Sequence, residues 1–200
     1  MYKKLVDIFL DWNSKINLSA IRDKEWVKIK HINDSLEWLK VIEDLVKEDS
    51  KLSNLNSQFS IVDVWTWSWF PVLPLAIEKP EWNFVWIESV RKKVDAVNDI
   101  IKQLWLKNIE IIWTRAEDYK KKQFDILTAR AVAYIDKLLK FTKHLVKKWW
   151  YFVLYKLNSK EEYEDILKNC KKHNLELVGK FPYKLFDEDI ERVIYVLKKI

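Results

Sequence analysis

Apolar residues change their spacing along the chain, and the change separates an N-terminal part from the rest. In residues 2–12 and 28–47, apolar residues recur every three or four positions, which is the spacing of a helix with one buried face. From residue 61 onward, short apolar runs typical of buried strands alternate with segments of helical spacing. We therefore expect two N-terminal helices, joined by a polar loop, followed by alternating strands and helices.

The alternating part predicts a sheet covered by helices. Strands are expected at residues 61–64, 83–88, 109–113, 124–129, 151–157, 175–181 and 190–198, and helices at 72–77, 91–104, 135–145 and 161–174. Strands that alternate with helices predict a doubly wound, mainly parallel α/β sheet, because parallel neighbours are joined by helical crossovers. Functional sites on such sheets lie at the carboxyl ends of the strands.

The turn between the first expected strand and its helix has an unusual composition. Trp65, Trp67 and Trp69 follow the apolar run 61–64, and Pro71 opens the helical segment. In nucleotide-binding folds this turn is rich in glycine, because a residue without Cβ adopts positive φ at little cost and lets the ligand reach the main chain. Indole rings at three alternate positions would prevent both.

The overall composition offers an explanation for these tryptophans. Average glycine usage of about 7% predicts about 14 glycines in such a chain, whereas this one has 1 Gly and 12 Trp. We infer that most tryptophans stand where the working protein has glycine, as would follow if a gene from a lineage that reads UGA as glycine were translated with UGA as tryptophan. Trp105 and Trp149-Trp150 also stand where turn chemistry favours glycine. Trp12, on an apolar helical face, is interpreted as a true tryptophan. The alternative is a chain that is simply rich in tryptophan.

Charge and cysteine content restrict the class of protein. The formal net charge of +6, with several lysine-rich clusters, favours a polyanionic partner. The single cysteine, Cys170, excludes an intramolecular disulfide and a zinc site built from several cysteines, and it fits a cytosolic setting. The chain contains no apolar run that could span a bilayer and no signal-peptide core. We therefore expect a cytoplasmic protein with no membrane partner and no metal site.

Three loops are expected to meet at the carboxyl edge of the sheet: the 65–70 turn, the end of the second strand at Glu88, and residues 114–118. Glu88 lies 23 residues after Trp65, close to the spacing of about 20 residues at which a carboxylate accepts the ribose hydroxyls of a bound nucleoside. This spacing favours an adenosyl cofactor, with a solvated carboxylate as the alternative. Asp63 could orient the turn or bind the cofactor's amino group, or it could simply cap the backbone.

One motif in the second helix is ambiguous. His31, Asp34 and Ser35 fall within one helical turn, which could indicate a site. We interpret His31 instead as a satisfied surface or core histidine.

Six motifs, taken in order, carry a resemblance to a known family. They are Trp12-Asn13-x-Lys15-Ile16-Asn17-Leu18, His31-x-x-Asp34-Ser35-Leu36, Asp63-Val64-Trp65-Thr66-Trp67-Ser68-Trp69-Phe70-Pro71, Arg91-Lys92-Lys93, Arg115-Ala116-Glu117 and Thr128-Ala129-Arg130-Ala131-Val132-Ala133. The set resembles the bacterial small-subunit ribosomal RNA methyltransferases that form 7-methylguanine, the glucose-inhibited division protein B family. The family has glycine at the three tryptophans of the turn and at Trp105 and Trp149-Trp150.

The resemblance implies a fold, a cofactor and a substrate. The fold would be that of a Rossmann-like class I methyltransferase, with a helical extension over residues 1–57 packed on a methyltransferase domain over residues 58–200. The cofactor would be S-adenosyl-L-methionine. The partner would be small-subunit ribosomal RNA, or the assembling small ribosomal subunit, and the protein would act as a monomer.

The resemblance also implies roles for individual residues. Cofactor-binding residues would be Trp65 and Trp67 through their backbone, Phe70, Glu88 at the ribose, Ala116 and Glu117 around the adenine, and Arg130, which lies beside the methyl-transfer cleft and is also the implied catalytic residue. The sequence departs from the family at Val72 and Leu157, where the family often has glycine.

The implied reaction needs no strong base. Guanine nitrogen 7 carries a free lone pair and can attack a sulfonium methyl without losing a proton, so catalysis would rest on orientation, with Arg130 placing the base or a phosphate. One alternative is a nicotinamide-dependent oxidoreductase, although its G-x-G-x-x-G spacing differs from the alternate positions seen here. Another is a non-catalytic RNA-binding module of the same fold, which would be favoured if the tryptophans are literal.

Overall fold

The computed structural model describes residues 1–55, 58–64, 69–130, 134–185, 189 and 191–200. Its α-helices are α1 (Tyr2–Ile16), α2 (Lys24–Val27), α3 (Asp34–Glu48), α4 (Ser50–Ser53), α5 (Val72–Glu78), α6 (Arg91–Leu104), α7 (Ile135–Thr142) and α8 (Lys160–His173). A π-helical segment, η1 (Lys28–Asn33), joins α2 to α3, and short 3-10 turns form η2 (Ala116–Asp118) and η3 (Lys143–Leu145). The strands are β1 (Ser60–Val64), β2 (Asn83–Glu88), β3 (Ile109–Trp113), β4 (Phe124–Ala129), β5 (Val146–Leu157), β6 (Leu175–Tyr183) and β7 (Arg192–Lys199).

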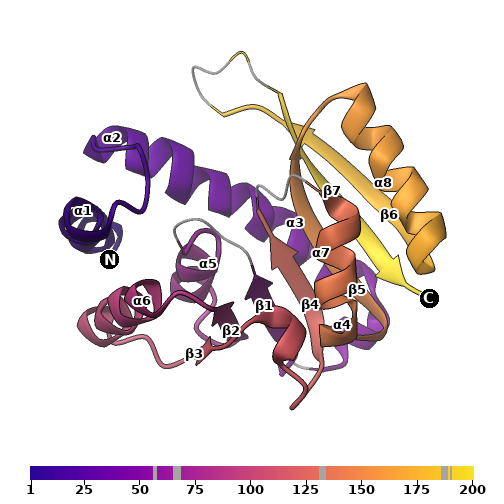
Figure 1. Cartoon of the computed structure of the whole chain (residues 1–200), viewed down its shortest axis with the longest axis horizontal. Coiled ribbons are helices and arrows are strands. Elements are labelled where there is room, and N and C mark those ends of the chain that lie inside the picture. The colour runs from indigo at the N-terminus through magenta and orange to yellow at the C-terminus, as the bar shows by residue number, and fades with distance from the viewer. Residues whose placement is uncertain (56–57, 65–68, 131–133, 186–188, 190) are drawn as a thin grey trace.

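The strands form one seven-stranded sheet in the order β3-β2-β1-β4-β5-β7-β6 (Figure 1). The pairs from β3 to β5 are parallel, and β7 runs antiparallel to both β5 and β6. The sheet is therefore mainly parallel, as the sequence predicts. The chain moves outward from β1 to β3 and then returns to place β4 on the other side of β1, so β1 and β4 form the topological switch point where ligands bind in such sheets.

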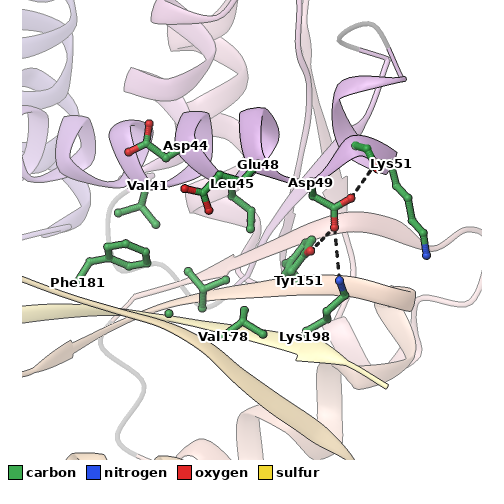
Figure 2. A pocket seen from close by; sticks show the side chains of 13 residues that line it. Val41, Asp44, Leu45, Glu48, Asp49, Lys51, Tyr151, Val178, Phe181 and Lys198 are labelled. Atoms are coloured by element: carbon green, nitrogen blue, oxygen red, sulfur yellow. Dashed lines mark hydrogen bonds and ion pairs between the residues drawn. The ribbon is translucent and has the colours of Figure 1, made fainter.

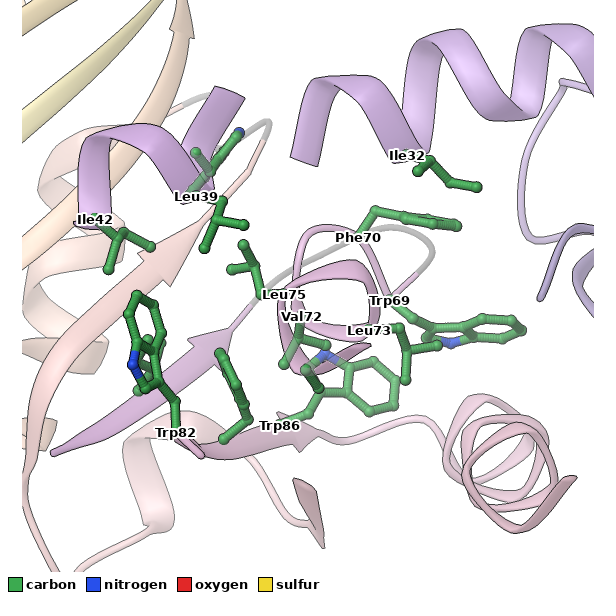
Figure 3. Packing of buried hydrophobic residues seen from close by; sticks show 14 of the residues in the cluster. Ile32, Leu39, Ile42, Trp69, Phe70, Val72, Leu73, Leu75, Trp82 and Trp86 are labelled. Atoms are coloured by element: carbon green, nitrogen blue, oxygen red, sulfur yellow. The ribbon is translucent and has the colours of Figure 1, made fainter. Parts of the chain in front are cut away.

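Helices cover both faces of the sheet and bury two apolar cores. Alternate residues of each strand point to opposite faces, so Ile61 and Val62 of β1 belong to different cores. One core joins the sheet to α1, α3, α5 and α6, and the other joins it to α7 and α8 (Figure 1). Figure 3 shows side chains of the first core, among them Ile42 of α3, Leu75 of α5 and Trp86 of β2. The N-terminal helices thus share a core with the sheet.

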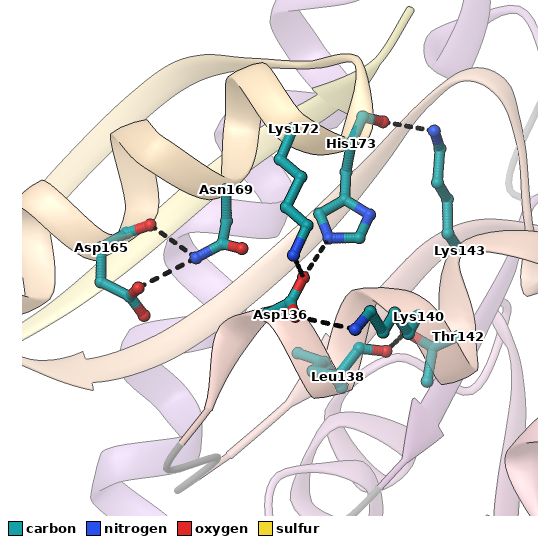
Figure 4. Close-up of polar contacts among 9 residues, drawn as sticks. All are labelled: Asp136, Leu138, Lys140, Thr142, Lys143, Asp165, Asn169, Lys172 and His173. Atoms are coloured by element: carbon teal, nitrogen blue, oxygen red, sulfur yellow. Dashed lines mark hydrogen bonds and ion pairs between the residues drawn. The ribbon is translucent and has the colours of Figure 1, made fainter.

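On the opposite face, a polar cluster joins α7 to α8 (Figure 4). The Asp136 carboxylate lies 2.8 Å from Lys172 Nζ, 2.7 Å from His173 Nε2 and 3.1 Å from Lys140 Nζ. Hydrogen bonds from these groups, that of Lys172 first, lower the pKa of Asp136 far below its usual value. Lys143 also donates to the carbonyl of His173. These contacts link the two helices outside their apolar core.

The main differences from the sequence prediction are in three segments. Helix α1 continues to Ile16 because Asn13, expected in a loop, is buried: its amide donates to Ile21 O at 2.8 Å and accepts from Ser19 N at 2.8 Å. The expected helix over 28–47 is extended at both ends and contains the π-helical segment. Strand β5 begins at Val146 rather than at residue 151, and its pairing with β4 shifts between Val146 and Tyr151.

None of the helices described here is long and apolar enough to cross a membrane.

Candidate cofactor and substrate site

A cavity of about 320 Å³ lies at the carboxyl ends of β2 and β3. Its lining residues are Ile87, Glu88, Ser89, Thr114, Arg115, Ala116, Glu117, Lys137 and Phe141. Three residues implied as cofactor ligands, Glu88, Ala116 and Glu117, therefore line one cavity although they come from two separate elements, β2 and η2. The 3-10 turn η2 follows β3 directly and brings Ala116 and Glu117 to this edge.

Glu88 is the last residue of β2 and its side chain is nearly buried. One carboxylate oxygen, Oε1, accepts from Val90 N at 2.8 Å, and the other, Oε2, lies 3.4 Å from Lys93 Nζ. Both contacts come from the start of α6, so they fix the carboxylate at the cavity wall. Ser89 Oγ also donates to Oε1, at 3.5 Å. An ionised carboxylate offers about four acceptor positions, so these three contacts leave one position for a ribose hydroxyl, and displacement of the long Ser89 contact would free a second.

Arg130 follows β4 at the same edge of the sheet. Its Nη2 donates to Lys30 O at 2.9 Å and lies 3.0 Å from Asp34 Oδ2. Its guanidinium also lies over the ring of Tyr155, 5.3 Å from the ring centroid. The N-terminal helices therefore hold the residue that is implied as catalytic.

Asp34 is the centre of a buried network that sequence reasoning missed. Its Oδ1 accepts from Arg192 Nη1 at 2.8 Å and from the hydroxyl of Tyr183 at 2.7 Å. Burial, followed by the charge of Asp34, raises the pKa of Tyr183 far above its ordinary value, so this phenol stays a donor. The signal available in the sequence was the one-turn grouping of His31, Asp34 and Ser35.

Phe70 lies against the N-terminal helices and is not among the residues that line the Glu88 cavity. Its buried ring stacks on His31, with centroids 4.7 Å apart and planes at 12°, and meets the edge of Phe9 at 5.5 Å. Burial lowers the pKa of His31 to about 3, so the ring is neutral near pH 7. His31 Nε2 lies 3.3 Å from Ser19 Oγ, whereas Nδ1 is buried without a hydrogen-bond partner. His31 is thus a core histidine, but only one of its nitrogens has a partner.

A larger cavity of about 580 Å³ lies apart from these residues, between α3, α4 and strands β5, β6 and β7. Figure 2 shows Asp49 at one end, where its carboxylate binds Tyr151 and Lys198. None of the implied site residues that the structure describes lines this cavity.

Comparisons with known proteins decide the family. The family model described as rRNA small subunit methyltransferase G matches residues 1–182. The chain belongs to this family. It is 34% identical to the ribosomal RNA small subunit methyltransferase G of Thermoanaerobacter sp. (strain X514), over 100% of this chain and 81% of that protein. It is 33% identical to the protein of the same name from Lachnoclostridium phytofermentans, over 97% of this chain and 78% of that protein.

Solved structures agree on the fold of this methyltransferase. A SAM-dependent methyltransferase from Aquifex aeolicus superposes with a TM-score of 0.61 at 13% identity, over 88% of this chain and 93% of that one. M. jannaschii TYW2 in complex with AdoMet superposes with a TM-score of 0.57 at 16% identity, over 72% of this chain and 70% of that one. The Rossmann-like fold and the methyltransferase class are confirmed. S-adenosyl-L-methionine, which the TYW2 structure contains as AdoMet, is the cofactor that the resemblance implies. The oxidoreductase alternative is excluded.

The Glu88 cavity fits the adenosyl part of this cofactor. It combines a fixed carboxylate with the apolar walls of Ile87, Ala116 and Phe141, which is the combination that a ribose and an adenine require. Trp65 and Trp67 lie outside the described residues. Asp63, inside β1, is buried and its Oδ2 accepts from the Thr128 hydroxyl at 2.6 Å.

Trp69 in this methyltransferase has the backbone of a glycine. Its φ is 64°, its side chain is fully buried, and its indole Nε1 has no hydrogen-bond partner. Trp105 and Trp149 also have positive φ, at 58° and 72°. A bulky residue in this region is an outlier that costs about 1–3 kcal/mol. All three are positions that the sequence analysis assigns to glycine, and the backbone therefore supports that hypothesis.

Proposed function

We propose that this methyltransferase transfers the methyl group of S-adenosyl-L-methionine to ring nitrogen 7 of a guanine in small-subunit ribosomal RNA. The observation that carries the proposal is the match of the rRNA small subunit methyltransferase G model to residues 1–182. The positions of the Glu88 cavity and of Arg130, both at the carboxyl edge of the sheet, support it.

Each part of the site would have a separate task. Glu88 would accept the ribose hydroxyls, and Ala116 and Glu117 would surround the adenine. The bound cofactor supplies an electrophilic methyl group. Arg130 would orient the guanine or its phosphate so that nitrogen 7 faces that methyl group at about 3 Å, because orientation is the main requirement when the nucleophile is already a free lone pair.

The chain's only cysteine argues against methylation of a pyrimidine carbon, which uses a cysteine nucleophile. Cys170 is buried on α8, and burial raises the pKa of its thiol to about 11. A thiol in this state is a poor nucleophile. A guanine nitrogen needs no such residue.

We also propose that residues 1–57 are a helical extension of a methyltransferase domain formed by residues 58–200, and that the enzyme acts in the cytoplasm as a monomer. The extension is an integral part of the fold, because Leu5 and Phe9 of α1 are buried in the core that also contains Ile61 of the sheet. The proposed substrate supports the location. Sedimentation of the purified chain tests the oligomeric state.

The reaction can be tested directly. The protein from its native host, incubated with methyl-labelled cofactor and ribosomal RNA from a strain that lacks the modification, should release 7-methylguanosine as the labelled nucleoside after digestion. Label in another nucleoside would reject the assignment to nitrogen 7, and label only in large-subunit RNA would reject the substrate.

A further inference from the structure

Two arginines from distant parts of the chain share one buried carboxylate. Asp34 is fully buried, and Arg130 and Arg192 lie on its two sides at 3.0 and 2.8 Å. A buried carboxylate is costly unless it is paired, so the pairing explains how Asp34 is tolerated.

The two arginines are held differently. Arg192 Nη1 makes a hydrogen bond to Oδ1, which also accepts from Tyr183. Oδ2 lies near Arg130 Nη2 but has no contact of hydrogen-bond geometry. Asp34 is therefore hydrogen-bonded to Arg192 and ion-paired with Arg130.

The orientation of Arg130 is nevertheless restricted on two further sides. Its Nη2 donates to the carbonyl of Lys30, and the ring of Tyr155 lies beneath the guanidinium of Arg130 at 5.3 Å and that of Arg192 at 5.9 Å. The hydrogen bond to Lys30 uses one of the five N–H donors of a guanidinium. Arg130 is thus fixed in direction and keeps donors for a ligand.

The cluster lies where the substrate must approach. Arg130 follows β4 beside β1, at the topological switch point. Arg192 begins β7 and pairs with Leu157, the last residue of β5, so it lies at the same carboxyl edge. The side chain of Arg130 is 16% exposed and that of Arg192 is 8% exposed, which leaves Arg130 as the arginine that reaches a ligand.

We propose that Asp34 is a positioning residue: with Arg192 and Tyr155 it holds Arg130 so that its guanidinium binds a phosphate of the substrate RNA beside the target guanine. This inference rests on the proposed function. Arginine is suited to this task because its planar donors match phosphate oxygens. The N-terminal helices thereby contribute to substrate orientation.

The proposal predicts a result opposite to that expected from charge alone. Asp34→Asn removes a negative charge, and charge alone would tighten RNA binding and steepen its salt dependence. Loss of orientation should instead release Arg130 from its phosphate, and each lost phosphate contact reduces the slope of log K against log salt by about 0.7 for single-stranded RNA. The salt slope needs no catalysis, so it can be measured whether or not the proposed reaction occurs.

The experiment uses the full chain with glycine at positions 65, 67 and 69. Asp34→Asn and Arg130→Ala should both reduce the salt slope by about 0.7 and lower kcat at least tenfold. The cofactor Kd should change less than kcat does, because Arg130 is also an implied cofactor residue. Asp44→Asn is the matched control, because Asp44 lies on the same helix, is exposed and pairs only with Lys47 in the described contacts. It removes the same charge and should leave both readouts as in the parent.

Tyr183→Phe keeps all the charges of the cluster and removes one hydrogen bond to Asp34, so it should change kcat less than threefold. A salt slope in Asp34→Asn that equals or exceeds that of the parent would overturn the proposal. So would an Asp34→Asn variant that melts at a lower temperature but has the same kcat per folded molecule as the parent. Failure of the proposed function would appear differently, as absence of 7-methylguanosine in the parent itself.

Discussion

Helices α6 and α8 end in the same backbone conformation but with different residues. The residue after α8 is Asn174, with φ 51° and ψ 61°, and the residue after α6 is Trp105, with φ 58° and ψ 30°. Helix α1 ends like α8, at Asn17. Asparagine and glycine are the usual residues at such left-handed helix ends, because other side chains clash with the backbone there. Trp105 is 76% exposed, so burial of its indole does not compensate for the clash.

The comparison extends to the whole described part of the chain. Its five non-glycine residues with positive φ are Asn17, Asn174, Trp69, Trp105 and Trp149. The chain's one glycine, Gly179, does not have positive φ. The left-handed positions are thus occupied either by asparagine, which tolerates this conformation, or by tryptophan, which the composition shows in excess.

Two other tryptophans, Trp12 and Trp82, have ordinary backbones and indoles that make specific contacts. Trp12 Nε1 donates to Asp99 at 2.8 Å, which joins α1 to α6, and Trp82 packs against Phe59 with ring centroids 4.8 Å apart. Tryptophan therefore occurs in two structural settings. The positions with positive φ suit glycine, and the positions with an ordinary backbone and a packed or hydrogen-bonded indole suit tryptophan.

The largest effect is expected at the turn after β1. Replacing Trp65, Trp67 and Trp69 with glycine should tighten binding of S-adenosyl-L-methionine at least 100-fold, because it relieves strain of about 1–3 kcal/mol at each residue that needs positive φ and lets the ligand approach the main chain of the turn. Calorimetry measures the affinity, and Trp105→Gly, distant from the turn in sequence, is the control that should leave it unchanged.

Tight cofactor binding by the chain as written would contradict this prediction. Peptides from the native host that span residues 59–79 give an independent check, because they show which residue the cell inserts. Tryptophan in those peptides would reject the codon hypothesis and would favour the non-catalytic RNA-binding module.

The next effect tests whether the cavity binds the same ligand as the turn. In the glycine-containing chain, Glu88→Gln should weaken the cofactor by about 1.5–3 kcal/mol, or roughly 10- to 150-fold, because hydrogen bonds to an ionised carboxylate are lost. Glu110→Gln is the control, since Glu110 is an exposed carboxylate on β3 that pairs with Lys122 at 3.8 Å. Equal affinities of both variants would remove the ribose role of Glu88.

A smaller effect is expected where the turn meets the N-terminal helices, through His31 stacked on Phe70. The pKa of His31 is lowered to about 3 in the folded protein, against about 6.5 in an unfolded chain. Between these values the unfolded state binds more protons, so stability is fully present above pH 6.5 and falls as the pH decreases. The loss between pH 6.5 and 5.5 should be about 1 kcal/mol.

Denaturant unfolding of the parent and of His31→Asn measures this difference. His144 also has a lowered pKa, chiefly through burial, and contributes in the same direction in both proteins. The variant should therefore show a weaker pH dependence, and an unchanged dependence would reject the assignment to His31.

The sequence predicts three of the parallel strands well and the long-range network poorly. The strands Asn83–Glu88, Ile109–Trp113 and Phe124–Ala129 have the expected bounds, because each is a short apolar run with polar flanks. The sequence places the start of strand β5 too late, because the polar and tryptophan-rich stretch 147–150 resembles a turn. In the structure this stretch belongs to the strand, and a shift in the pairing with β4 accommodates it. No local pattern could place Arg192 beside Asp34, because the two are 158 positions apart.

The smallest effect concerns the two helix ends themselves. Trp105→Gly should raise the free energy of unfolding by about 0.5–1 kcal/mol. A left-handed conformation costs about 1–2 kcal/mol in a residue with a bulky side chain, and the greater conformational freedom of glycine in the unfolded state cancels part of the gain from removing that cost. Asn174→Gly changes the same kind of position and should alter stability by only a few tenths of a kcal/mol, because asparagine already tolerates this conformation. Urea unfolding of both variants beside the parent measures the difference, and its slope shows whether the unfolded state has changed. Equal changes in the two variants would mean that tryptophan is no worse than asparagine at a left-handed helix end, and the backbone support for glycine at position 105 would then be lost.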